Sequence, residues 1–291
     1  MRRQPRRTAA TALVTIAAIL AGCATLRSPL GVVFSGGSAC GGPGRFADAA
    51  GANRQSLSDL AWAPFGRPER GWEVYATRLR QTLKAGCPAD SPGFAERLAA
   101  WQGGRGLAPT GVMDPAAFEA IKTDWQAQRP FVRLRQTGVC PDPPGDADLT
   151  ALRPDDVVDG KTVQMRKGAA RALHRMLAKA RAQTPSAASG QFRLVAFSGY
   201  RSPAYDAARC VSAGDCDGVG RAVCSAHRTG LAVDLVLGAA PGYPVDSSAD
   251  ANRLYQTRQP AYRWLIAHAH RFGFVNYAYE PWHWEWTGES P

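Results

Sequence analysis

The sequence has no apolar run long enough to cross a bilayer, for which about 20 residues are needed. The apolar stretch from Thr8 to Ala21 falls short of that length. Acidic residues are also few, with 24 Asp and Glu against 35 Lys and Arg, and none lies in the first 22 positions. Arginine, by contrast, occupies four of the first seven positions. A basic start followed by a short apolar stretch is typical of a secretory signal, so we expect residues 1–22 to be a leader.

The leader ends in Leu20-Ala21-Gly22-Cys23, which resembles the lipobox of bacterial lipoproteins. The resemblance implies cleavage before Cys23 and attachment of a lipid to that cysteine. Ala24 stands where an aspartate would favour inner-membrane retention. We therefore expect an exported lipoprotein that faces the periplasm, in the outer membrane of a Gram-negative bacterium. The alternative is an ordinary signal peptide with an incidental cysteine.

The net charge of +11 falls to about 11 − 4 = +7 once the four leader arginines are removed. Such a moderate basic excess would suit an anionic cell wall or membrane surface. A solvated basic face needs no partner at all. Nucleic acid is not an expected partner for an exported protein, and no obligate protein partner is indicated.

The chain contains seven cysteines, six of them beyond Cys23. In an exported protein these six predict up to three disulfides, and the sequence does not choose among the 15 pairings. An alternative is that Cys224, three residues before His227, supplies a thiolate to a metal. An oxidising compartment favours disulfides instead. The six are Cys40, Cys87, Cys140, Cys210, Cys216 and Cys224.

The composition divides the chain into segments. Residues 23–70 are rich in Gly, Ala, Ser and Pro and are expected to form a flexible tether. From Trp72, apolar residues recur at helical spacing and predict three short helices with glycine-rich connections. Asp114-Pro115 opens the third helix, as N-cap and first helical residue. Residues 130–154 contain Cys140-Pro-Asp-Pro-Pro-Gly and are expected to form a linker.

The predicted helical segment, residues 71–129, carries a second resemblance. Its run from Phe94 to Phe118, with Trp101-Gln102 at the end of the second helix, is similar to the peptidoglycan-binding-domain repeat. The resemblance implies a small three-helix bundle that binds the cell wall. The alternative is a helical spacer with no ligand, because a fold does not determine a function.

Histidine is scarce, with five in the chain, and this limits the candidates for a metal site. His227 and Asp234 are seven residues apart with Gly230 between them, which predicts a loop residue followed by a strand residue rather than helical neighbours. Glu280 and His283 add a third nitrogen and a nearby carboxylate. Two histidines and one carboxylate are a typical catalytic zinc set, which leaves a position for water.

The other three histidines are expected to be structural. His268 and His270 lie two apart on a predicted helix and so face different directions. His174 lies on another predicted helix, which begins near Met165.

Three separated motifs carry a family resemblance. They are Ser198-Gly-Tyr-Arg201-Ser, Ser225-x-His227-x-x-Gly230-x-Ala232-x-Asp234 and Glu280-x-Trp282-His283. Together they resemble the zinc D-alanyl-D-alanine carboxypeptidases of the VanY type over roughly residues 150 to 288. Their joint occurrence is far more specific than any one of them.

The resemblance implies that His227, Asp234 and His283 hold Zn²⁺. Glu280 would then be the general base for the water that attacks the peptide carbonyl. By the same resemblance, the second expected domain, residues 155–291, would be the zinc D,D-peptidase domain.

The resemblance also implies residues that contact the substrate. Arg201 would bind substrate and stabilise the developing negative charge, with a surface ion pair as the alternative. Ser225 could hydrogen-bond substrate or a ligand, or simply cap its loop. Trp282, which the family motif also carries, could stack on substrate, although core packing is the favoured role. Pro203-Ala-Tyr-Asp206 departs from the glutamine of many relatives, so substrate preference is left open.

The expected fold is α+β, with a small, mostly antiparallel sheet flanked by helices (the DD-peptidase/Hedgehog-like fold that the resemblance implies), preceded by the three-helix bundle. The expected function is removal of terminal D-Ala from peptidoglycan stem peptides. A peptidoglycan endopeptidase that cuts within the stem or cross-link is the second enzymatic possibility. A wall-anchoring lipoprotein without activity is the third.

Overall fold

The computed structural model describes residues 40–42, 44–136, 140–188, 193–214, 216 and 224–289. All of these residues belong to one compact unit. Within these ranges, no helix is both long and apolar enough to cross a membrane. The predicted leader and the lipidation residue Cys23 lie outside the described residues.

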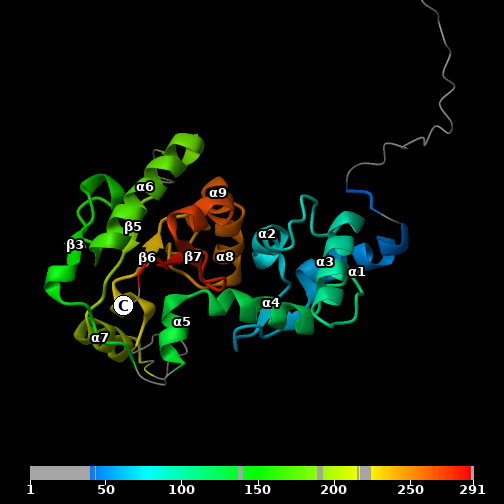
Figure 1. The fold of residues 1–291 in the computed structure, drawn as a ribbon, viewed down its shortest axis with the longest axis horizontal. Helices are drawn as coiled ribbons and strands as arrows, with labels where there is room; N and C mark the ends of the chain where they lie inside the picture. The colour runs from blue at the N-terminus through cyan, green and yellow to red at the C-terminus, as the bar shows by residue number, and fades with distance from the viewer. Residues whose placement is uncertain are drawn as a thin grey trace, which may run out of the picture. The chain divides into compact units, whose positions relative to one another are not determined.

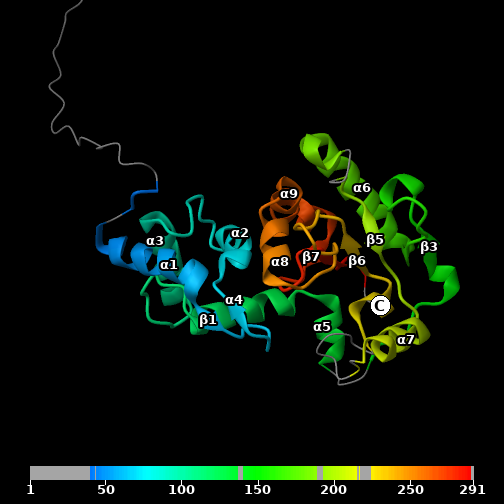
Figure 2. The same cartoon turned by 180° about the vertical axis from the view of Figure 1, so that it is seen from behind.

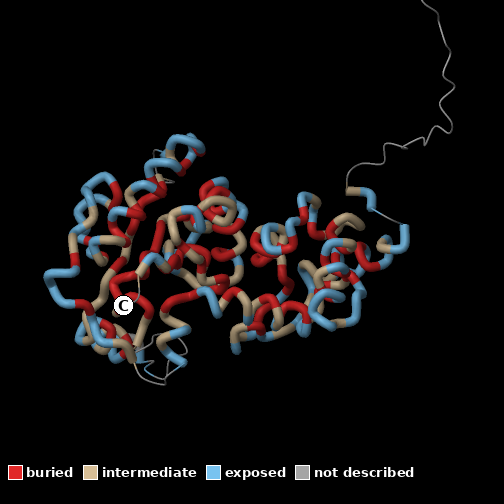
Figure 3. Tube along the Cα trace, in the orientation of Figure 1, coloured by how far each residue is buried: buried red, intermediate tan, exposed pale blue. Residues whose placement is uncertain are grey.

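A four-stranded antiparallel sheet (Figure 1) carries two of the three candidate metal ligands, Asp234 and His283. In spatial order its strands are β5 (Ala196–Ser198), β6 (Ala232–Leu235), β8 (His283–Trp286) and β7 (Phe274–Asn276). All four residues of β6 are buried, because strands pair with it on both sides (Figure 3). The register places Asp234 of β6 opposite His283 of β8.

The helices α6 (Lys167–Gln183) and α9 (Pro260–His268) pack with this sheet in one hydrophobic core. Leu173 and Met176 of α6 are fully buried there, as the helical spacing of the apolar residues predicts. Trp284 of β8 joins the same core. The fold is therefore α+β, with helices flanking a small antiparallel sheet, as predicted from the sequence.

The three helices expected after Trp72 are present. They are α2 (Glu73–Thr82), α3 (Pro92–Gly104) and α4 (Pro115–Ala127). Asp114 caps α4, since its side chain accepts a hydrogen bond from the Ala117 N–H at 2.7 Å. These helices bury a second cluster that includes Leu79, Phe94 and Phe118.

Part of the segment expected to be a tether is folded. Helix α1 (Ala47–Asp59) and the hairpin strands β1 (Ala61–Trp62) and β2 (Glu69–Arg70) lie within it. Asn53 explains why α1 docks, because its fully buried amide donates to the Gly111 carbonyl and accepts from the Met113 N–H. A glycine-, alanine-rich composition therefore does not exclude close helix packing here, although the division into domains stays a prediction.

The expected linker also contains regular structure (Figure 2). Helix α5 (Pro130–Arg135) follows α4, and β3 (Leu149–Ala151) pairs with β4 (Gln164–Arg166). The remaining elements are α7 (Pro203–Ala213), α8 (Asp250–Thr257) and the short 3-10 helices η1 (Gly44–Phe46), η2 (Asp146–Asp148), η3 (Pro154–Asp156), η4 (Pro185–Ala187), η6 (Ala226–Thr229) and η7 (Ala269–Phe272).

Three disulfides join the six cysteines beyond Cys23. They are Cys40–Cys87, Cys140–Cys224 and Cys210–Cys216. Because Cys224 is bridged to Cys140, it is not available as a thiolate ligand. The bridge instead anchors the chain just before His227.

Candidate metal centre

His227 and Asp234 reach one another through a tight turn. His227 lies in η6, and Gly230 ends that turn with a φ of 70°, which a side chain would disfavour. The chain then enters β6, where Asp234 is paired with His283 of β8. Directly opposed residues of an antiparallel pair lie close together, so the register brings the third ligand to the first two.

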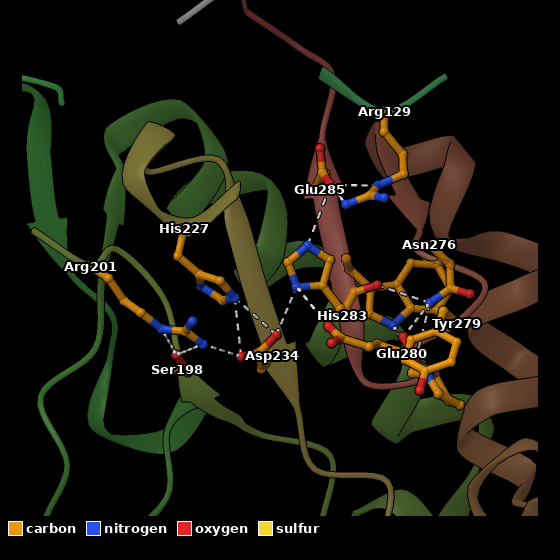
Figure 4. A network of polar contacts seen from close by, with 12 residues as sticks. Arg129, Ser198, Arg201, His227, Asp234, Asn276, Tyr279, Glu280, His283 and Glu285 are labelled. Atoms are coloured by element: carbon orange, nitrogen blue, oxygen red, sulfur yellow. Dashed lines mark hydrogen bonds and ion pairs between the residues drawn. The ribbon is translucent and has the colours of Figure 1, made fainter. Parts of the chain in front are cut away.

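The three side chains face one another in Figure 4. The Nε2 atom of His227 lies 3.1 Å from Asp234 Oδ1, and the Nδ1 atom of His283 lies 2.9 Å from the same oxygen. One ligand atom of each residue can be chosen so that all three lie within 4.8 Å of one another. All three residues are buried. Two imidazole nitrogens and a carboxylate oxygen at this spacing suit a zinc ion.

The opposite ring nitrogens are also held. The Nδ1–H of His227 donates to the Gly199 carbonyl at 2.6 Å. A Cβ on Gly199 would lie only 2.4 Å from the Gln164 oxygen. A side chain at position 199 would therefore force the backbone to move, and with it the Gly199 carbonyl that holds His227. The Nε2 atom of His283 lies 3.4 Å from Glu285 Oε1. Histidines that ligate metals typically donate their other nitrogen to a carbonyl or carboxylate in this way.

Glu285 and Arg129 were not singled out as site residues from the sequence. The Arg129 Nε–H donates to Glu285 Oε1 at 2.7 Å, and the Phe131 N–H donates to Oε2 at 3.0 Å. Burial opposes ionisation of Glu285, but Arg129 and His283 outweigh it and lower the pKa of Glu285 to about 2. Strand alternation does place Glu285 on the His283 face. Arg129 is 156 residues away, and no local pattern points to it.

Glu280 lies beside the cluster without joining it. Its Oε2 atom is 4.0 Å from His283 Nδ1, and 34% of its side chain is exposed. Burial raises the pKa of the Glu280 carboxyl, His283 opposes the rise, and the Asp234 charge adds to it. A carboxylate next to a metal position, yet not a ligand, is placed to exchange protons there.

The three residues predicted to contact substrate, Arg201, Ser225 and Trp282, lie in different surroundings. Arg201 lies in the site, where its Nη2 donates to Asp234 Oδ2 at 2.9 Å. The Ser225 hydroxyl donates to Asp206, a residue of the unusual Pro203–Asp206 segment. Trp282 is only 3% exposed and belongs to the hydrophobic core, which gives its indole a packing role.

Zinc binding at pH 7 is expected to release about one proton. In the metal-free protein, burial and the Arg201 charge lower the pKa of His227 to about 4, so this ring is neutral. Burial acts against the charge on His283, but hydrogen bonds to Asp234 and Glu285 raise its pKa to about 9. The proton on His283 must therefore leave when the metal binds.

Calorimetric zinc titrations in buffers of different ionisation enthalpy measure this release. The proton count should fall as the pH rises through about 9, because His283 is then already neutral. Release that does not depend on pH in this range would contradict the assignment to His283.

Part of the chain is similar to known proteins. Residues 162–289 match the family model VanY, D-alanyl-D-alanine carboxypeptidase. No curated protein matches the chain. A solved structure of the LdcB LD-carboxypeptidase is similar with a TM-score of 0.37 and 22% identity, over 51% of this chain and 72% of that one. The matched residues 162–289 contain the three candidate ligands together with Glu280 and Arg201, so this part of the chain is similar to the VanY D-alanyl-D-alanine carboxypeptidases.

Proposed function

We propose that the protein is a zinc-dependent D-alanyl-D-alanine carboxypeptidase that removes terminal D-Ala from peptidoglycan stem peptides. The observation that carries the proposal is the buried cluster of His227, Asp234 and His283 with Glu280 beside it. The match of residues 162–289 to the VanY family model supports the same reaction class.

The donor set fits zinc, and His227, Asp234 and His283 would hold it. When bound, zinc supplies a Lewis acid and allows water to act as a nucleophile near neutral pH. Glu280 accepts one proton from the attacking water. As the peptide C–N bond breaks, Glu280 returns that proton to the departing D-Ala nitrogen, which leaves as the amine. The raised pKa of Glu280 suits a group that both accepts and donates.

Arg201 supplies the fixed positive charge of the site. Its guanidinium is held by Ser198 Oγ at 3.0 Å and Asp234 Oδ2 at 2.9 Å, and its side chain is 15% exposed. A cation held rigidly at this position can stabilise the oxyanion that forms from the substrate carbonyl. It can also bind the terminal carboxylate of the stem peptide.

The proposed setting is the periplasmic face of the outer membrane, with a lipid on Cys23. The helical segment would keep the active site near its polymeric substrate through a high effective concentration. The motifs at the N-terminus and the basic mature chain support this setting.

The test uses the purified protein and a pentapeptide that ends in D-Ala-D-Ala. We expect stoichiometric zinc and D-Ala release that a chelator abolishes and added zinc restores. Cleavage of intact sacculi without D-Ala release would point to the endopeptidase instead. Failure to bind metal or to cleave either substrate would leave only the anchoring role.

A further inference from the structure

The loop between β7 and β8 carries Glu280 and leads directly into His283, the first residue of β8, and the VanY match contains all of it. Some of the side chains that hold this loop lie outside the matched residues. These side chains belong to the N-terminal segment, which the sequence predicts to consist of a tether, a helical bundle and a linker. Three separate sets of buried contacts make the connection, and they rest on different atoms of the loop.

The first contact passes through Asn276, the last residue of β7. Its side-chain Nδ2–H₂ lies within hydrogen-bond distance of three loop carbonyls, those of Glu280 at 3.3 Å, Pro281 at 3.2 Å and His283 at 2.9 Å. Arg78 of α2 holds Asn276 in turn, since its Nη1 donates to the Asn276 backbone oxygen at 2.7 Å and to Oδ1 at 3.2 Å. The orientation of the Asn276 amide, with its nitrogen toward the loop, is thus set by a residue 198 positions earlier.

The second contact reaches Tyr279, which precedes Glu280. Arg253 of α8 donates through Nε to the Tyr279 carbonyl at 2.8 Å. The same guanidinium donates to the Tyr75 hydroxyl at 2.6 Å and pairs with Glu69 at 3.0 Å. Arg67, in the β1–β2 hairpin, donates to the Tyr279 hydroxyl at 3.2 Å. The hairpin and α2 therefore hold both the backbone and the ring of Tyr279.

The third contact is the Arg129–Glu285 pair described above (Figure 4). It contacts the Nε2 atom of His283, the ring nitrogen that faces away from Asp234. The Arg129 guanidinium also lies 3.9 Å from the centre of the Tyr277 ring, at the start of the loop. Arg129 is 6% exposed and Glu285 is 1% exposed, so this pair is shielded from solvent.

We propose that Arg78 and Arg129, with the Glu69–Tyr75 pair behind Arg253, are positioning residues of the metal centre. The N-terminal segment then completes the active site rather than serving only to anchor it. The expected effect on kcat rests on the proposed function, whereas the expected effects on metal binding do not. The loop closes through backbone hydrogen bonds, from the Tyr277 N–H to the His283 oxygen at 3.0 Å and from the His283 N–H to the Glu280 oxygen at 2.9 Å. The side chains described above add the contacts that tie this turn to the rest of the fold. Partners of this kind typically change metal affinity or activity by about 10- to 100-fold.

The test compares Arg78→Met and Arg78→Lys with Arg258→Gln in the full chain. Arg258 joins α8 to α2 through Glu73 at 2.6 Å, but it is 56% exposed and contacts no loop atom in the described contacts. Co²⁺ replaces zinc, because its absorption spectrum reports ligand geometry without any substrate. The metal Kd, kcat, KM and Tm are measured for each variant.

We expect Arg78→Met to alter the Co²⁺ spectrum, to weaken metal binding about 10-fold or more, and to lower kcat of the metal-loaded protein with little change in KM. Arg78→Lys should recover part of each effect, because an ammonium can still donate to Asn276. Arg258→Gln should match the parent protein in spectrum, Kd and kcat.

A lower Tm for Arg78→Met with an unchanged spectrum, Kd and kcat would overturn the inference and leave Arg78 a purely structural role. If Arg78→Met does not fold, Arg78→Lys decides by the same readouts. If the parent protein binds Co²⁺ but releases no D-Ala, and the Arg78 variants still change the Co²⁺ spectrum and Kd as expected, the positioning role is supported and the proposed reaction is rejected. Failure of the parent protein to bind Co²⁺ would overturn both.

Discussion

Replacing Glu280 by glutamine is expected to lower kcat by about 10²- to 10⁴-fold, the usual contribution of a general acid–base group. Glutamine keeps the shape of the side chain but cannot accept the proton from water. Glu280 is not within the group of candidate metal ligands, which consists of His227, Asp234 and His283. The variant should therefore keep its zinc content and its Co²⁺ spectrum while it loses turnover.

Steady-state kinetics on the pentapeptide, together with metal analysis, measure this effect. Glu119→Gln is a matched control, because the Glu119 side chain is 61% exposed on α4 and pairs only with the neighbouring Lys122 among the described contacts. Its kcat should equal that of the parent protein. A Glu280→Gln variant with full activity would remove Glu280 from the mechanism, and loss of zinc would show that the residue binds metal instead.

Replacing Arg253 by methionine is expected to destabilise the protein by about 3–5 kcal/mol, the usual cost of removing one partner of a buried ion pair. Arg253 is fully buried and donates to the Tyr279 carbonyl, the Tyr75 hydroxyl and the Glu69 carboxylate. Methionine fills much of the space, but it removes the donor to the Tyr279 carbonyl and leaves the buried Glu69 carboxylate without its cation. The free energy of unfolding in urea at pH 7 measures the loss.

The pH dependence of this loss identifies its cause. Burial raises the pKa of Glu69 and Arg253 opposes that rise, so removal of Arg253 raises the pKa further. A carboxyl whose pKa is raised in the folded state stabilises the protein at low pH, and that stability is lost as the pH rises through the folded pKa. The deficit of Arg253→Met should therefore shrink as the pH is lowered into the range where Glu69 becomes protonated.

Arg54→Met is the control for the stability measurement. Arg54 pairs with Asp90 at 3.6 Å, but its side chain is 70% exposed. Loss of an exposed pair should cost no more than about 1 kcal/mol. Equal destabilisation by both variants, or a deficit of Arg253→Met that does not change with pH, would contradict the role assigned to the buried Glu69–Arg253 pair.

The amino-acid sequence was sufficient to predict local features, which depend only on residues close together in the chain. The helix starting at Pro115, with its Asp114 cap, follows from side-chain chemistry within one turn. The turn-then-strand spacing from His227 to Asp234 likewise follows from Gly230 and the apolar run after it. Period-2 alternation also placed His283 and Glu285 on one face of a strand.

Composition misled where burial depends on distant partners. The segment before Trp72 resembles a tether, yet α1 is folded because Asn53 meets Gly111 and Met113, 58 and 60 residues later. Whether this segment folds was decided by what packs against it, which local composition does not contain.

By itself, the sequence supplied the candidate ligands His227, Asp234 and His283 and the neighbouring Glu280, as residue types in three separate motifs. The family resemblance that these motifs carry implied the α+β class. Only the tertiary structure decided which cysteines pair and which distant side chains support the ligands, such as Arg129 on Glu285 and Arg78 on Asn276. Partners 156 and 198 residues apart meet only through the packing of several elements, and no periodicity along the chain records that packing.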